Sequence, residues 1–214
     1  KMVKNIKNKK LNPNTIIKIE MKKLLFFLVF FSSVTFSQFK FGAAKGLFMG
    51  IAVGPRFPIG VFADAQNIGI GAEVIFSYSD NEILPIFLYT MIGYQHYPGR
   101  QDFYKRSDYA SFSSNVLMIA PGVRYYFKPI LENVVLLMPI IDIGAEYALF
   151  ENWHQFKSDA GKQNFVEDVS KFGFHIGAGF SMFILDVVTY YNYLPKNQYL
   201  SFNLRANIPI FVKM

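Results

Sequence analysis

Apolar and polar side chains alternate strictly along the stretch from Leu200 to Asn207. A period of two is the pattern of a β-strand, whose successive side chains point to opposite faces of a sheet. Most of the chain after residue 45 repeats this pattern, and no amphipathic helix is evident that could cover the apolar side. We therefore expect the apolar side to contact lipid. The apolar face of this stretch holds Leu200, Phe202, Leu204 and Ala206, and its polar face holds Ser201, Asn203, Arg205 and Asn207.

Seven more segments carry the same alternation, each near the roughly 9–11 residues that a tilted transmembrane strand needs. A closed sheet with a polar interior is one of the two structures that can span a bilayer. The pattern therefore predicts an all-β fold, an eight-stranded antiparallel up-and-down transmembrane β-barrel. The expected strands cover residues 46–56, 68–78, 84–97, 114–127, 135–149, 171–182, 186–194 and 200–207.

The connections between these segments alternate in length. Long connections at 57–67, 98–113 and 150–170 are separated by much shorter ones. Outer-membrane barrels have short periplasmic turns and longer external loops, so we expect the long connections outside the cell. Aromatic residues near the strand ends match the girdles at the two membrane interfaces. They are Tyr78, Tyr97, Tyr125, Tyr126, Phe127, Tyr147, Phe150, Tyr191, Tyr193 and Tyr199.

The polar face of each segment is expected to point into the barrel. Eight strands leave an interior just wide enough for side chains, and inward glycines such as Gly71 and Gly177 make room for long polar groups. A buried charge is costly unless it is paired, so we expect the inward charges to pair and to plug the lumen. The predicted structural network of the lumen consists of Arg56, Glu73, Arg124, Asp142, Glu146, His175, Asp186 and Arg205.

The first 37 residues differ in character from the rest. They hold eight Lys and one acid, Glu20, which accounts for the whole net charge of +7 and leaves the remaining chain neutral. A short charged zone, an apolar run and small residues before Gln38 form the three zones of a secretory signal peptide. We interpret the chain as a mis-called upstream extension at 1–20, a signal peptide at 21–37 and an outer-membrane β-barrel domain at 38–214.

These features argue against several classes of function. A neutral domain offers no basic patch for nucleic acid. Cys is absent, which excludes disulfides, thiolate chemistry and thiolate metal sites. His96, His154 and His175 do not have the spacing of metal ligands. We therefore predict no catalytic, metal or cofactor site.

A series of short motifs runs in order from about residue 48 to residue 211. They include Gly50-Ile51-Ala52-Val53-Gly54-Pro55-Arg56-Phe57, Gly69-Ile70-Gly71-Ala72-Glu73, Ala120-Pro121-Gly122-Val123-Arg124-Tyr125-Tyr126-Phe127, Phe172-Gly173-Phe174-His175-Ile176-Gly177-Ala178-Gly179 and Tyr199-Leu200-Ser201-Phe202-Asn203-Leu204. The series resembles the outer-membrane protein β-barrel domain family, small porin-like barrels similar to the membrane domain of outer membrane protein A. The resemblance implies the barrel fold, a location in the outer membrane of a Gram-negative cell and the barrel-assembly machinery as a partner. It implies no shared biochemical activity.

Three further features carry hypotheses about binding. His175 is a lone inward histidine, for which a hydrogen-bonded structural role is favoured over a proton-linked or metal role. Arg100, Lys105 and Arg106 lie in the second long connection, where they could contact lipopolysaccharide phosphates or be ordinary solvated charges. Trp153 marks either a recognition tip or an aromatic residue at the headgroup level.

The sequence therefore predicts a non-enzymatic integral outer-membrane barrel with a structural or surface-interaction role and a plugged polar lumen. We expect it to be a monomer that contacts outer-membrane lipid, with an external ligand that the sequence does not identify. The polar lumen also supports an alternative, a small-solute porin-like channel. A second alternative is a lipid-modifying outer-membrane enzyme, since Ser and His occur together. A soluble lipocalin-like barrel is the rival fold, and it would need its apolar residues inside.

Overall fold

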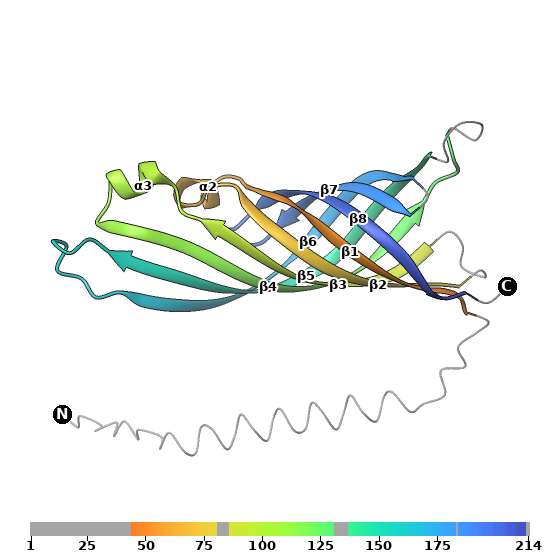
Figure 1. The fold of residues 1–214 in the computed structure, drawn as a ribbon, viewed down its shortest axis with the longest axis horizontal. Helices are drawn as coiled ribbons and strands as arrows, with labels where there is room; N and C mark the ends of the chain where they lie inside the picture. The colour runs from red at the N-terminus through yellow and green to blue at the C-terminus, as the bar shows by residue number, and fades with distance from the viewer. Residues whose placement is uncertain (1–43, 81–85, 131–136, 183, 213–214) are drawn as a thin grey trace, which may run out of the picture. The chain divides into compact units, whose positions relative to one another are not determined.

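Eight antiparallel strands form a closed barrel in the computed structural model, which describes residues 44–80, 86–130, 137–182 and 184–212 (Figure 1). Each strand pairs with the next one along the chain, and the last pairs with the first. The predicted up-and-down barrel is confirmed. The predicted signal peptide and upstream extension, residues 1–37, lie outside the described residues. The strands are β1 (Ala44–Pro58), β2 (Gly69–Asp80), β3 (Ile86–Pro98), β4 (Tyr109–Tyr126), β5 (Leu137–Phe156), β6 (Phe165–Met182), β7 (Leu185–Tyr193) and β8 (Tyr199–Phe211).

The apolar side of the sheet faces outward. Phe202 and Phe174 are 47% and 48% exposed, whereas Arg205 and Asp142 are fully buried inside the barrel. A soluble sheet has the reverse arrangement, with its apolar side chains packed against other protein. The observed orientation excludes the lipocalin-like alternative.

Two connections at one end of the barrel carry short helices and contact each other. Helix α2 (Phe62–Ala65) lies between β1 and β2, and helix α3 (Gln101–Lys105) lies between β3 and β4 (Figure 1). Arg100 Nη1 donates to the carbonyl oxygen of Ala63 at 2.9 Å. We call this end, where the sequence predicts the long external loops, the outer end. Within the described residues, no helix is long and apolar enough to cross a membrane.

Two of the predicted external loops are wrong in their extent, because β4, β5 and β6 continue farther toward the outer end than their neighbours. The sequence predicts loops at 98–113 and 150–170. The strands instead remain paired as far as His154 and Phe165, and the connection from β5 to β6 is only 157–164. The alternation of lipid-facing and polar residues stops before these strands end. The strands can continue beyond it because their backbone hydrogen bonds do not require apolar side chains on the outer face.

The aromatic residues near the strand ends divide between the two faces of the sheet. Tyr125 and Tyr147 point outward and are 40% and 42% exposed, as a girdle requires. Tyr97, Phe150 and Tyr199 are buried inside the barrel, so the prediction that they belong to a girdle is wrong. Each of these three lies in phase with the inward residues of its strand, and that phase decides its face.

Candidate functional site: the lumen of the barrel

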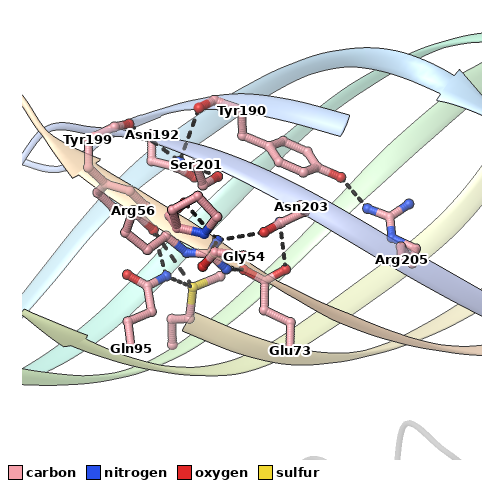
Figure 2. Close-up of polar contacts among 12 residues, drawn as sticks. Gly54, Arg56, Glu73, Gln95, Tyr190, Asn192, Tyr199, Ser201, Asn203 and Arg205 are labelled. Carbon is pink, nitrogen blue, oxygen red and sulfur yellow. Dashed lines mark hydrogen bonds and ion pairs between the residues drawn. The ribbon is translucent and has the colours of Figure 1, made fainter. Parts of the chain in front are cut away.

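The first ionic network in the lumen joins β1, β2 and β8 (Figure 2). Arg56 Nη2 donates to Glu73 Oε1 at 2.5 Å, and Arg56 Nη1 donates to Asn203 Oδ1 at 2.5 Å. Asn203 Nδ2 in turn donates to Glu73 Oε2 at 3.1 Å. Gly71 makes room for this arginine, because a Cβ at Gly71 would lie 2.7 Å from Arg56 Nε. The three side chains therefore bond to one another in the buried interior of the barrel, where Arg56 Nε has no partner.

Glu146 is the one predicted network carboxylate that does not meet a cation among the described side chains. Its Oε1 accepts a hydrogen bond from the Tyr199 hydroxyl at 2.8 Å, while its buried Oε2 has no partner. Gln95 Nε2 donates to the Tyr199 oxygen at 2.9 Å, and the Tyr97 hydroxyl donates to Gln95 Oε1 at 2.6 Å. The side chain that bonds to this carboxyl group is the neutral Tyr199, which departs from the expectation that all inward charges pair.

The second ionic network joins β4, β5, β7 and β8. Arg124 makes a two-pronged contact with Asp142, with Nε donating to Oδ1 at 2.7 Å and Nη2 donating to Oδ2 at 2.9 Å. Arg205 Nη1 donates to Asp186 Oδ2 at 3.3 Å. The Tyr190 hydroxyl connects the two pairs, since it donates to Asp142 and accepts from Arg205. In both pairs the two residues are direct cross-strand neighbours, so the register of the sheet creates the contacts.

His175 lies beside the second network without bonding to its charges. Its Nε2 is 2.6 Å from the Tyr89 hydroxyl, and its Nδ1 has no partner. Its ring packs edge-on against Tyr190, with ring centroids 5.6 Å apart. Across the described part of the chain, no three His, Asp or Glu side chains are arranged to hold a metal ion. The geometry is that of a hydrogen-bonded interior histidine.

An apolar cluster lies above the first network at the outer end. Phe62 of α2 is only 6% exposed, and its ring packs 4.8 Å from Tyr97 and 6.2 Å from Phe150, measured between centroids. Leu194, between β7 and β8, and Tyr199 belong to the same buried cluster. No strand period predicts the role of Phe62, because this residue falls in a predicted loop.

Several uncharged residues that bond within the lumen are absent from the predicted network of charged groups and His175. The alternation assigns Asn203 and Gln95 to the inward face, but it does not show that they bond to the other interior groups. Tyr89, Tyr190 and Tyr199 lie in the same inward phase, but the sequence did not single them out, because aromatic residues are also common on a lipid-facing surface. Their buried hydroxyl groups contact His175, Asp142 and Glu146 inside the lumen.

The basic residues of the β3–β4 connection do not form a shared site. Arg100 holds α2 through the carbonyl oxygen of Ala63, whereas Lys105 and Arg106 are exposed. Farther along this connection, Asp108 accepts a hydrogen bond from Lys162 Nζ at 2.7 Å. The Lys162 ammonium lowers the pKa of Asp108 below its usual value. Charges in this region therefore mainly tie the outer connections to one another.

The other two histidines lie in separate surroundings. His96 Nδ1 is 2.8 Å from Asn115 Oδ1, and His154 Nδ1 is 3.0 Å from the Tyr109 hydroxyl. His154 also stacks on Phe165 at the outer end, with ring centroids 4.3 Å apart. These contacts give the two imidazoles no common partner.

Comparison with known proteins supports the fold. No protein-family model and no curated protein matches the chain. Among solved structures, Neisserial surface protein A (NspA) matches with a TM-score of 0.51 and 15% identity, over 77% of this chain and 97% of NspA. Two weaker matches each cover 77% of this chain and 99% of the other: Ail, the attachment invasion locus protein of Yersinia pestis (14% identity, TM-score 0.43), and the N-terminal β-barrel domain of Pseudomonas aeruginosa OprF (17%, 0.40). The chain therefore has the fold of the small eight-stranded outer-membrane β-barrels.

Proposed function

We propose that this protein is a non-enzymatic integral protein of the outer membrane of a Gram-negative cell, with a structural or surface-interaction role. One observation carries the proposal: Phe202 faces outward while its strand neighbours Asn203 and Arg205 are fully buried. An apolar exterior around a charged interior suits a barrel surrounded by acyl chains. Lipid solvates the apolar exterior, and protein groups inside the barrel pair with the interior charges.

The two ionic networks and the apolar cluster support a plugged lumen. Arg56, Arg124 and Arg205 each pair with a carboxylate inside the barrel. Moving a solute past them would require breaking buried ion pairs, which is strongly unfavourable. Phe62 adds an apolar layer at the outer end. These contacts argue against the porin-like alternative.

A surface-interaction role is supported by the outer parts of β4, β5 and β6. They carry exposed apolar side chains beyond the lipid-facing rows, including Trp153, Phe165 and Val166, which are 43–51% exposed. Exposed apolar groups of this kind on a rigid sheet are suited to contact a partner. The three histidines lie in different environments, so no geometry favours the lipid-modifying enzyme.

Cell fractionation and gel mobility test the membrane assignment. We expect the protein in the outer-membrane fraction, and we expect detergent-extracted protein to migrate faster before heating than after it. Recovery as a soluble periplasmic protein would refute the proposal. Planar-bilayer recordings test the lumen separately, with no stable conductance expected for the wild type. A steady conductance from the wild type would favour the channel instead.

A further inference from the structure

A groove lies on the outer wall of the barrel across β3, β4, β5 and β6, and it has a volume of about 560 Å³. Its lower part is apolar, because Tyr94, Leu117 and Leu149 are direct neighbours on adjacent strands and all three are exposed. Its upper part is polar. We call it the outer groove, and its outward-facing lining consists of Tyr94, Leu117, Tyr147 and Leu149 below and Asn115, Glu151, Asp168 and Ser170 above.

The outer groove crosses the upper limit of the lipid-facing surface. At the lower edge of the groove, Ile119 and Tyr147 are cross-strand neighbours with exposed apolar faces. Four residues farther out on the same strands, Asn115 and Glu151 are neighbours, and Glu151 is opposite Asp168 on β6. A lipid molecule changes from acyl chain to headgroup over the same short distance. The groove therefore has the polarity profile of one outer-leaflet lipid.

The charge of the outer groove is negative. Glu151 and Asp168 are the charged side chains of its lining, and neither forms an ion pair with a Lys, Arg or His of the described residues. Like charges directly opposite each other in a sheet are destabilising. A cation placed between the two carboxylates would relieve this repulsion, whereas a phosphate without a cation would increase it.

We propose that the outer groove binds a membrane lipid whose headgroup carries an ammonium group. The ammonium donates charge-assisted hydrogen bonds to Glu151 and Asp168, and an acyl chain lies over Leu117 and Leu149. This inference rests on the proposed membrane location, but it assigns a site on the outer wall that is distinct from the lumen. It also differs from the earlier hypothesis that basic residues contact lipid phosphates.

Trp153 provides a direct probe, because it is the only tryptophan of the chain and its Nε1 donates to Glu151. The protein in neutral maltoside micelles is titrated with short-chain phosphatidylethanolamine or with phosphatidylglycerol of the same chain length, and Trp153 emission is recorded. We expect a saturable change in emission for both lipids, with a midpoint concentration about fivefold to tenfold lower for phosphatidylethanolamine than for phosphatidylglycerol. Exposed ion pairs between the ammonium group and the two carboxylates supply a preference of this size.

Two variants complete the experiment. Asp168→Asn leaves the Trp153 contact in place and is expected to reduce the preference to less than about twofold. Asp159→Asn removes a carboxylate in the β5–β6 connection, outside the groove lining. This variant is expected to keep the preference for phosphatidylethanolamine. Equal midpoints for the two lipids, or an undiminished preference in Asp168→Asn, would overturn the inference. Heat-modifiable gel mobility of each sample tests independently whether the barrel has formed. A sample with this mobility but without the lipid preference contradicts the proposed groove, whereas a sample without this mobility contradicts the membrane assignment.

Discussion

Replacing Glu73 with Gln is expected to destabilise the barrel by about 3 kcal/mol. Glu73 is the carboxylate that pairs with the fully buried Arg56 at 2.5 Å. The variant keeps the side-chain volume but leaves the guanidinium without a counter-charge, and breaking a buried pair in this way costs roughly 3–5 kcal/mol. We expect the lower end of that range because the Gln oxygen still accepts a hydrogen bond from Arg56.

The matched variant is Glu146→Gln, in the same lumen. Glu146 accepts one hydrogen bond from Tyr199, and no described cation pairs with it. Neutralising this side chain therefore leaves no charge unpaired, and the Gln oxygen can still accept the tyrosine hydrogen. We expect the free energy of unfolding to change by less than about 1 kcal/mol, in either direction.

Urea unfolding of the refolded protein in detergent micelles, followed by Trp153 fluorescence, measures both effects. With a urea dependence of roughly 1–3 kcal/mol per molar, Glu73→Gln lowers the midpoint by about 1–3 M. The double variant Arg56→Gln/Glu73→Gln is expected to lose less than the sum of the single losses, because the two residues are coupled. Equal destabilisation by Glu73→Gln and Glu146→Gln would refute the assignment of the ion pair.

Three further changes test other parts of the barrel. Phe62→Ala removes the buried ring of the outer cluster, so we expect a loss of about 3 kcal/mol and faster amide hydrogen exchange at the outer ends of β3 and β5. Gly144→Ala places a Cβ about 2.4 Å from the backbone oxygen of Pro121, so refolding to the heat-modifiable form should fail. Because Lys162 lowers the pKa of Asp108, their contact should persist at neutral pH and disappear as the pH falls through that lowered pKa, which amide exchange of residues 157–164 would record.

Each of these changes has a control and a contradicting result. Val61→Ala alters an exposed neighbour of Phe62, and equal exchange rates in the two variants would rule out a stabilising role for the packing of the Phe62 ring. Ala72→Val adds volume on the lipid-facing side and should refold, whereas normal refolding of Gly144→Ala would contradict the packing argument. Asp108→Asn should remove the acid-dependent step in exchange, and an unchanged step would assign it to another group.

The sequence by itself determined the fold and the two faces of the barrel. The alternation from Leu200 to Asn207 assigns Arg205 to one face and Phe202 to the other, and the structure places them inside and outside. This succeeds because side-chain direction in a strand depends only on position along that strand. The same reasoning failed for Tyr199, where the strand-end position was given more weight than the strand phase.

Only the tertiary structure decided which interior groups meet. Arg124 finds Asp142 because the register of β4 and β5 makes them neighbours, whereas Glu146 on the same strand faces Tyr199 and no described cation. Phe62 packs into the buried cluster at the outer end from a connection that has no strand period. Register, strand tilt and loop conformation set distances across the lumen, and none of these follows from the alternation along a single strand.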